Sequence, residues 1–291
     1  MKILITGDQG FVGSETRRQL EAIKIGAVTP HKVVGYDIMN NCDIRDKYQF
    51  ERCVLEEKPD RILHLAAIAR FSDADKDPQL AFETNVLGTK NVSEVAERFH
   101  VPLVYSSTGS VYMPITDFSG SIKEDWPAKG NSVYGCTKYA GETYVRDLSP
   151  HIILRYAHLY GKEKRMHGLI GGFVERIERG IAPTLYGGKQ SNDFTYIKDV
   201  AAANIAALLA PWDKWNQTYN IGTGEEITAE AAGKIICDAL EWDSSKVEIK
   251  EARTVDPERF LFDCSKAERM LGFKAEYDFK LGLEDMFKKD V

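Results

Sequence analysis

The residues best suited to carry chemistry are Tyr134 and Lys138, which lie four positions apart in the segment Tyr-Gly-Cys-Thr-Lys. In a helix, this spacing puts both side chains on one face. A free tyrosine has a pKa near ~10, and a cation held beside it stabilises the phenolate and lowers that pKa toward neutrality, where proton transfer is efficient. The same spacing also arises by chance, as a half-exposed tyrosine beside a solvated lysine. The rest of the sequence decides between the two interpretations.

A second pattern, at the N-terminus, predicts a dinucleotide site. An apolar run at residues 2–5 is followed by Gly7, Gly10 and Gly13 and then by a helical pattern, which together predict strand, turn and helix. In such a turn the first glycines allow close approach of a pyrophosphate, and the last allows close packing of the helix, whose N-terminus favours an anion. A glycine-rich turn that binds no ligand is the alternative.

An acidic residue after the next expected strand indicates which dinucleotide binds. Residues 32–36 predict that strand, and Asp37 follows it, 24 residues after Gly13. A carboxylate at this point can bind both hydroxyls of the adenosine ribose and repels a 2′-phosphate, so the pattern favours NAD over NADP. Asp43 and Ile44 lie just downstream, either beside the adenine or as ordinary surface residues.

Composition limits the partners and the location. The 291 residues include 38 basic and 44 acidic side chains, for a net charge of −6, and there is no basic run, so we expect no nucleic-acid partner. No apolar stretch approaches the ~20 residues of a membrane span, and the N-terminus shows no signal-peptide pattern, so we expect a cytoplasmic protein without a membrane partner. The five cysteines form neither a CxxC motif nor a cluster with histidine, which predicts free thiols and no metal site.

Alternating strand and helix patterns predict an α/β fold with a Rossmann-type, doubly wound parallel sheet. The alternation breaks down after about residue 160. We therefore predict an NAD-binding domain over 1–160, to which 195–222 returns, and a smaller, mainly substrate-binding lobe over 161–291. The expected strands are 61–65, 101–106 and 152–155, and the expected helices are 47–57, 84–99, 134–148, 228–240 and 265–271.

A hydroxyl-rich segment follows the strand expected at 101–106, where a doubly wound fold places its active site. With the features above, the chain resembles the extended short-chain dehydrogenase/reductases, in their branch of NAD-dependent sugar-nucleotide epimerases and dehydratases, and it looks most like the UDP-glucose 4-epimerases. The resemblance covers nearly the whole chain. Its motifs are the glycine turn, Asp37, and the segments 64–67, 85–89, 106–112, 134–138, 155–161, 193–200, 220–224 and 263–267.

The resemblance implies roles for individual residues. It assigns Tyr134 as general acid/base, Lys138 as the residue that lowers the pKa of this tyrosine and holds the nicotinamide ribose, and Thr108 as a hydrogen-bond partner of the reacting hydroxyl. Proton transfer to Tyr134 would then accompany hydride transfer to NAD. The cofactor-binding residues that it implies are Gly7, Gly10, Phe11, Val12, Gly13, Asp37, Asp43, Ile44, Leu65, Ala66, Ala67, Asn85, Ser106, Tyr134, Lys138 and Tyr156.

The substrate-binding candidates are Thr108, His158, Asn192 and Arg253, and two of them depart from the family's pattern. Family members often have asparagine at the position of His158 and arginine at that of Asn192, where they contact the diphosphate of a nucleotide sugar. His158 either replaces the asparagine as a donor or is a packed structural histidine. Arg253 matches the family's C-terminal arginine, whose forked donors suit a diphosphate. A solvated arginine is the alternative.

Three functions stay open. The resemblance favours a sugar-nucleotide epimerase of the 4-epimerase type, which oxidises its substrate transiently to a keto-sugar. The first alternative is an NAD-dependent dehydrogenase or reductase of a sugar, sugar acid or other alcohol. The second is a non-catalytic NAD-binding regulator, which would not need the Tyr, Lys and Thr side chains.

Two further expectations come from the same family. Its 4,6-dehydratases carry an Asp-Glu pair directly after the active-site Thr, where this chain has Gly109 and Ser110, so dehydration is disfavoured. Related enzymes often dimerise through a four-helix bundle. We therefore expect a homodimer, built from the helices near 84–99 and 134–148.

Overall fold

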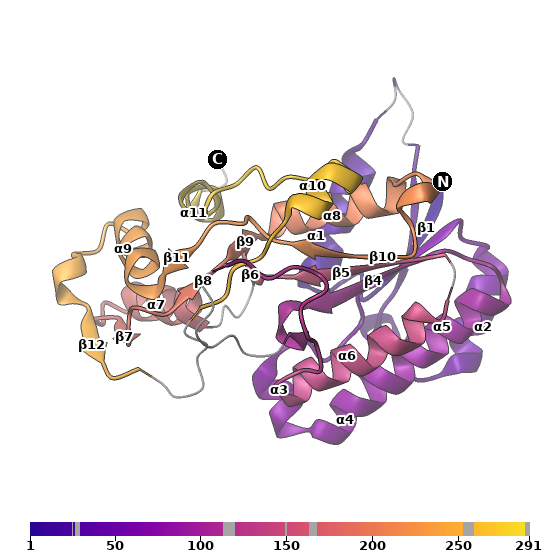
Figure 1. Ribbon diagram of the computed structural model, residues 1–291, viewed down its shortest axis with the longest axis horizontal. Helices are drawn as coiled ribbons and strands as arrows, with labels where there is room; N and C mark the ends of the chain where they lie inside the picture. Colours follow the sequence, from indigo (N-terminus) through magenta and orange to yellow (C-terminus); the bar gives the residue numbers. More distant parts are fainter. Residues whose placement is uncertain are drawn as a thin grey trace.

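A six-stranded parallel sheet forms the centre of the protein in the computed structural model, which describes residues 1–24, 26, 30–112, 120–148, 150–162, 168–252 and 259–288 (Figure 1). The strand order is β10-β5-β4-β3-β1-β2, and each neighbouring pair is parallel. The sheet strands are β1 (Lys2–Thr6), β2 (Lys32–Tyr36), β3 (Arg61–His64), β4 (Leu103–Thr108), β5 (His151–Tyr156) and β10 (Gln217–Ile221).

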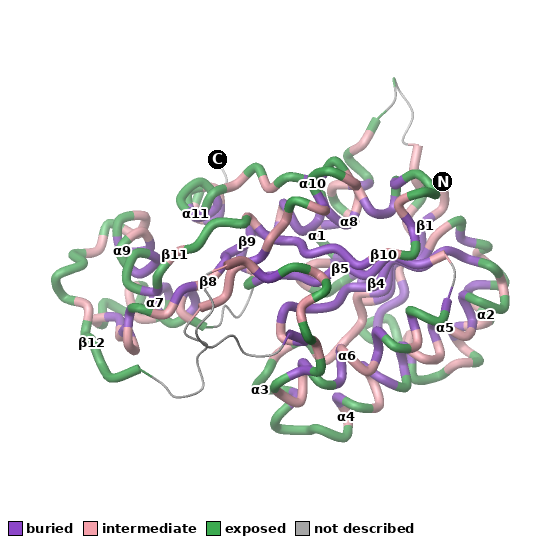
Figure 2. The backbone as a smooth tube through the Cα atoms, viewed as in Figure 1, coloured by how far each residue is buried: buried purple, intermediate pink, exposed green. Residues whose placement is uncertain are grey.

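Helices cover both faces of this sheet, which confirms the predicted doubly wound α/β fold (Figure 1). On one face Leu20 of α1 and Val200 of α8 pack on the sheet, and on the other face Phe50 of α2 and Val95 of α5 do so. The strands between these layers are therefore mostly buried, as Figure 2 shows for β4, β5 and β10, whereas β2 at the sheet edge is largely part-exposed. The helices of this part are α1 (Phe11–Ala22), α2 (Lys47–Glu57), α3 (Phe71–Lys76), α4 (Pro78–Phe82), α5 (Thr89–Arg98), α6 (Val133–Arg146), α8 (Ile197–Leu209) and α10 (Ser265–Leu271).

The helix expected at 84–99 is divided in two. A π-helical turn, Glu83–Gly88, precedes α5, and such turns are frequent at functional sites. Ile44 packs against this turn, because a Cβ at Gly88 would lie only 2.7 Å from the Cδ1 of Ile44. The sequence predicted one continuous helix here, and its apolar periodicity gave no sign of the π-helical turn.

A separate apolar cluster lies at the end of the molecule occupied by α7 and α9 (Figure 1). Phe173, Ile236 and Phe279 are among its buried side chains. The lobe boundaries predicted from the sequence stay a proposal, although β10 lies in the main sheet beside β5. The remaining elements are β6 (His158–Tyr160), α7 (Gly168–Glu178), β7 (Thr184–Tyr186), β8 (Ser191–Asn192), β9 (Phe194–Tyr196), β11 (Ile227–Thr228), α9 (Ala229–Ala239), β12 (Glu248–Lys250) and α11 (Phe279–Phe287), with short 3₁₀ turns at Ile38–Asn40, Gly109–Val111, Trp212–Lys214 and Ser244–Lys246.

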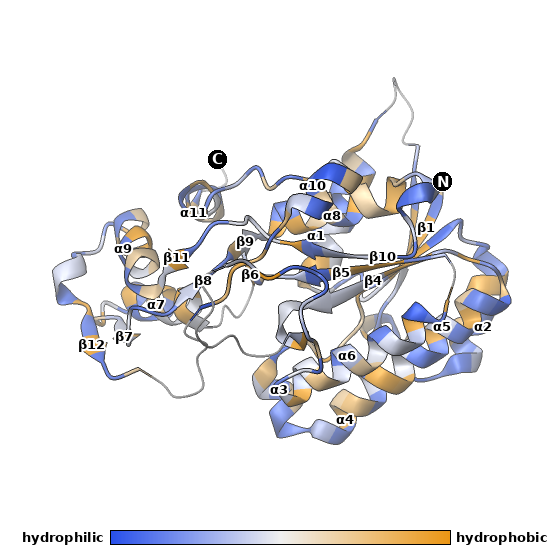
Figure 3. Ribbon diagram, in the orientation of Figure 1, coloured by the Kyte–Doolittle hydropathy of each residue, from blue (hydrophilic) through white to orange (hydrophobic). Residues whose placement is uncertain are grey.

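Surface elements show the expected polarity. Helix α10 is largely hydrophilic in Figure 3, and Ala267 is its buried residue. Across the described ranges, we find no helix with the length and apolar character needed to cross a membrane.

A buried ion pair fixes α6 to the sheet. Glu142 of α6 and Arg155 of β5 expose 0% and 2% of their side chains, and they form two hydrogen bonds, of 2.9 Å from Nε to Oε1 and 2.7 Å from Nη2 to Oε2. Ser107 of β4 donates to the same carboxylate at 2.5 Å, and Arg146 donates at 2.9 Å. Burial alone would raise the pKa of Glu142, but the hydrogen bonds and charge of Arg155 lead the opposing effects and lower it.

We expect Glu142→Gln to reduce the free energy of unfolding by about 3–5 kcal/mol at pH 7, because it leaves the charge of Arg155 buried without a counter-charge. Urea-induced unfolding measures this loss. The double variant Glu142→Leu/Arg155→Met, which removes both charges, is the control and should lose less. Because the folded pKa of Glu142 is lowered, its contribution is complete above the unfolded pKa and is lost as the pH falls through the folded pKa, so the gap between parent and Glu142→Gln should narrow in acid. Equal stability of parent and Glu142→Gln at pH 7 would refute the assignment.

Candidate active site

The glycine turn between β1 and α1 has the close packing that a dinucleotide loop requires. Gly7 adopts a left-handed conformation, with φ of 72°, and a Cβ there would lie 2.8 Å from the backbone nitrogen of Ala66. A Cβ at Gly13 would overlap the carbonyl oxygen of Gly7. Helix α1 therefore starts directly against the turn.

The N-terminus of α1 is suited to an anion. Gly10 is its N-cap and supplies no side-chain hydrogen bond, and the first turn contains no acidic residue. The first backbone N–H groups of a helix have no partners within the helix, so here they suit a phosphate. Phe11 and Val12 form the start of this helix, and both contact the apolar cluster around Phe173. The turn and the helix start thus fit the pyrophosphate of NAD.

Asp37 lies beside the same turn. Its side chain is buried, and its carboxylate accepts hydrogen bonds from the backbone N–H of Gln9 at 3.0 Å and of Met39 at 2.9 Å. It therefore links the glycine turn to the end of β2. The position agrees with the predicted ribose contact, which remains a prediction.

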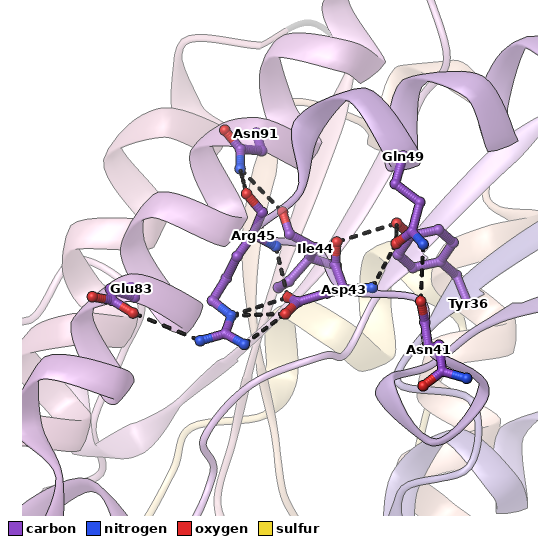
Figure 4. Close-up of polar contacts among 8 residues, drawn as sticks. All are labelled: Tyr36, Asn41, Asp43, Ile44, Arg45, Gln49, Glu83 and Asn91. Atoms are coloured by element: carbon purple, nitrogen blue, oxygen red, sulfur yellow. Dashed lines mark hydrogen bonds and ion pairs between the residues drawn. The ribbon is translucent and has the colours of Figure 1, made fainter.

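Asp43 and Ile44 are held by protein contacts (Figure 4). Arg45 donates to the carboxylate of Asp43 from Nε, at 2.9 Å, and from Nη2, at 2.6 Å, and these bonds lower the pKa of Asp43. Asn91 donates to the carbonyl oxygen of Ile44 at 3.1 Å. The side chain of Asp43 thus has an arginine partner, and that of Ile44 is buried.

The predicted cofactor residues after β3 are tied to β1 and to α6. Thr6 accepts hydrogen bonds from the backbone N–H of Leu65 and Ala66, both at 3.2 Å, and Ala67 follows them in the chain. The fully buried Asn85 accepts from the N–H of Ile68 at 2.8 Å and donates to the hydroxyl of Thr137, beside Lys138, at 3.0 Å. The amide of Asn85 therefore links the segment after β3 to helix α6, a role that the sequence did not indicate.

Thr108 and Tyr134, two of the side chains with predicted catalytic roles, lie together at the carboxyl end of β4, and Lys138 follows one turn along the helix of Tyr134. Tyr134 and Lys138 both belong to α6, and Thr108, the last residue of β4, acts on the hydroxyl of Tyr134 and opposes the rise in its pKa. Helix α6 begins here because Ser132, its N-cap, accepts from the N–H of Gly135 at 3.0 Å. A tyrosine hydroxyl bonded to a second hydroxyl can pass a proton to or from a substrate alcohol held by both.

Burial dominates the pKa values of this pair. It raises the pKa of Tyr134 to about 12, and the hydrogen bond with Thr108 opposes part of that increase. It lowers the pKa of Lys138 to about 7, and the charge of Glu142 opposes that decrease. Burial and Thr108 are the effects of the protein's own groups on the pKa of Tyr134, and the predicted lowering of this pKa by Lys138 stays a prediction. At neutral pH these groups keep Tyr134 protonated.

Two predicted cofactor residues lie on neighbouring strands. Ser106 of β4 is buried. Tyr156 of β5 is also buried, and its hydroxyl donates to the side-chain oxygen of Asn204 of α8 at 2.6 Å. The phenol of Tyr156 thus anchors α8 to the sheet, a role that the sequence did not indicate.

Two of the substrate-binding candidates, His158 and Asn192, belong to the short strands β6 and β8. His158 is exposed, and its ring contacts those of Phe194 and Phe260, with centroids 6.1 Å and 5.5 Å apart. Asn192 is partly buried in β8, and within the described residues its Oδ1 is buried without a hydrogen-bond partner. Arg253 lies outside the described residues. Nearby in sequence, Arg259 donates to both carboxylate oxygens of Glu226, at 2.8 Å and 2.7 Å.

Two aromatic residues that the sequence did not indicate, Phe71 and Phe260, border the site. Phe71 of α3, which is 47% exposed, packs edge-on against Tyr134 with ring centroids 5.3 Å apart. Phe260 covers Gly109, where a Cβ would overlap its ring. A single apolar residue carries no sequence signal of a site, whether it starts a short helix, as Phe71 does, or lies in an irregular segment, as Phe260 does. In the part of the chain that is described, no group of three or more His, Cys, Asp or Glu side chains could hold a metal ion.

Comparison with known proteins agrees with this geometry. Residues 3–222 match the model of the NAD dependent epimerase/dehydratase family. A putative UDP-glucose 4-epimerase of Methanocaldococcus jannaschii is 30% identical over 307 aligned positions, which span 97% of this chain and 96% of that protein. A Thermus thermophilus UDP-glucose 4-epimerase, solved in complex with NAD, has a TM-score of 0.85 at 28% identity over 100% of both chains. A dTDP-glucose 4,6-dehydratase of Streptomyces venezuelae, solved with NAD, has a TM-score of 0.86 at 28% identity over 98% of this chain and 95% of that one.

We expect Gly13→Ala to weaken NAD binding by at least about tenfold, because the added Cβ would overlap Gly7 and push α1 away from the turn. Isothermal titration with NAD measures the affinity. Gly172→Ala is the matched control, since a Cβ at this position of α7 would meet nothing within 4 Å. NAD affinity equal to the parent's in Gly13→Ala would show that the turn does not bind the cofactor as inferred.

Proposed function

Because the chain belongs to the NAD-dependent epimerase/dehydratase family and is an NAD-dependent enzyme, we propose that it is a sugar-nucleotide epimerase of the 4-epimerase type. The observation that carries the proposal is the constellation of Thr108, Tyr134 and Lys138 at the end of β4. The similarity to UDP-glucose 4-epimerases over almost the full chain supports it.

The proposed reaction assigns one step to each side chain. Tyr134 takes the proton of a sugar hydroxyl that Thr108 also binds, while the hydrogen on the same carbon leaves as hydride, so that a ketone forms. NAD, when bound, supplies the hydride acceptor and a positive charge that favours the phenolate. Rotation of the keto-sugar presents its other face, and return of the hydride and of the proton from Tyr134 inverts the carbon. Lys138 would hold the nicotinamide ribose of bound NAD, and its ammonium group would add positive charge near the phenol.

The residue after Thr108 favours epimerisation over dehydration. Loss of water needs an additional acid and base close to the reacting sugar. Gly109 has no side chain, and the ring of Phe260 fills the space into which one would project. Ser110 is the next residue, and its hydroxyl lies 3.3 Å from that of Thr108. Neither position 109 nor position 110 therefore supplies the carboxylate that dehydration would need, which supports epimerisation.

Asn192 is the observation that favours the second candidate function, a net dehydrogenase or reductase. An asparagine replaces the arginine that relatives often use for the diphosphate, and its Oδ1 is buried without a hydrogen-bond partner among the described residues. A net dehydrogenase or reductase of a sugar, sugar acid or other alcohol would not need that diphosphate contact. The homodimer through α5 and α6 and the cytoplasmic location likewise remain proposals.

We expect protein purified without added cofactor to contain NAD and to interconvert two 4-epimers of a nucleotide sugar without net formation of NADH. Mass spectrometry identifies the retained cofactor, and a panel of UDP- and dTDP-sugars followed by chromatography detects the epimers. Steady NADH formation in proportion to product, on a substrate without a nucleotide, would instead establish the dehydrogenase alternative.

We expect Tyr134→Phe to reduce kcat by about 10²–10⁴-fold, because the ring stays while the proton-transferring hydroxyl is lost. Its affinity for NAD should stay within about threefold of the parent's. Tyr144→Phe, a change of the same kind further along α6, is the matched control. Undiminished turnover by Tyr134→Phe would remove this residue from the mechanism.

A further inference from the structure

We propose that the ring of Tyr105 positions the ammonium group of Lys138 through a cation–π contact, which holds the charge in place and leaves its N–H donors available to the cofactor. The proposal rests on the cofactor-binding role given to Lys138 above. Tyr105 belongs to none of the catalytic or binding sets inferred so far.

The geometry is that of a buried cation–π pair. The Nζ atom of Lys138 lies 4.2 Å from the centroid of the Tyr105 ring, and the two residues expose 2% and 0% of their surface. Such a contact is worth more where water is excluded than at an exposed surface. The ring is itself fixed, because the hydroxyl of Tyr105 donates to the carbonyl oxygen of Lys138 at 3.3 Å. The same tyrosine therefore binds both the backbone and the charge of the lysine.

The nearest acidic residue on α6 has other partners. Glu142 is one turn beyond Lys138, and its carboxylate is held by Arg155, Arg146 and Ser107. Within the portion of the chain that the structure describes, Lys138 forms no ion pair. A carboxylate partner would accept hydrogen bonds from the N–H groups of the lysine and so occupy them. An aromatic ring instead attracts the positive charge through its face and leaves those N–H groups able to donate elsewhere. This difference matters for a lysine that must donate to a ribose.

Two further titratable side chains, those of His64 and Tyr105, lie near Lys138, and neither carries a negative charge that could pair with its ammonium group. Burial lowers the pKa of His64 well below its usual value, and Lys138 adds to this effect, so the imidazole is neutral. Burial also raises the pKa of Tyr105 well above its usual value, so the phenol is neutral. Since burial brings the pKa of Lys138 itself to about 7, a modest attraction decides how much of it is charged at neutral pH.

Two substitutions separate the ring from its hydroxyl. Tyr105→Phe keeps the ring, so its Kd for NAD and its kcat should stay within about threefold of the parent's. Tyr105→Leu removes the ring, so NAD affinity should fall about tenfold or more, measured by isothermal titration. In a Lys138→Met background, Tyr105→Leu should change NAD affinity by less than about twofold, because the partner of the ring is already gone.

The matched control is Tyr219→Leu. Tyr219 is a fully buried tyrosine of β10, and Lys266 lies over its ring at 5.1 Å, so this variant loses the same kind of contact away from the site. It should lower the melting temperature and leave NAD affinity unchanged. If Tyr105→Leu does not fold, phenylalanines with increasing fluorine content at position 105 keep the ring's shape and weaken its negative face. NAD affinity should then fall stepwise.

Four results would overturn the proposal. They are parent-like NAD affinity in Tyr105→Leu, an equal loss in Tyr105→Phe, an undiminished effect in the Lys138→Met background, and no dependence on fluorination. Parent-like NAD affinity in Lys138→Met would refute the role of Lys138 itself. Because each of these overturning results is a measurement of NAD affinity, absence of epimerase activity would refute the proposed reaction and leave this inference standing.

Discussion

The fixed position of helix α6 against β4 and β5 is the constraint on which the rest of the site depends. The buried pair of Glu142 and Arg155 joins the helix to β5, and Ser107, the neighbour of Thr108, binds the same carboxylate. Asn85 adds a second attachment through Thr137. Tyr134 and Lys138 are carried by this helix, so contacts made deep in the core decide where their side chains meet Thr108. Buried ionic contacts of this kind suit fixed geometry better than net stability.

Exclusion of water has opposite effects on the two groups that the chemistry needs. It favours the neutral forms of both Tyr134 and Lys138, as their shifted pKa values show, whereas proton transfer at neutral pH requires a phenolate beside an ammonium. Specific contacts therefore have to stabilise the charged forms that burial disfavours. The carboxylate of Glu142 acts at a distance, and the Tyr105 ring lies directly against the cation. In such a buried site, the positive charge of the oxidised cofactor would further favour the phenolate form of Tyr134.

The two sides of the site follow different physical principles. Toward NAD, the decisive feature is the absence of side chains, since the turn from Gly7 to Gly13 has no room for a Cβ and leaves the start of α1 for phosphates. Around Thr108 and Tyr134, aromatic rings from distant segments cover the backbone, and Phe260 fills the space above Gly109. The first principle is shared across a family that holds one cofactor. The second depends on residues brought together from distant parts of the chain.

The sequence by itself determined the elements whose signals are local. The glycine spacing, Asp37 and the alternation of strands and helices predicted the doubly wound parallel sheet and NAD as cofactor, and the four-residue spacing of Tyr134 and Lys138 placed both on one helix. Tertiary structure alone decided what surrounds them. The π-helical turn before α5, the inward-facing amide of Asn85, the bond from Tyr156 to Asn204 and the raised pKa of Tyr134 all depend on residues far apart in the chain. Periodicity reports which face of an element is apolar, but a pKa and a side-chain partner depend on what the fold brings to that face.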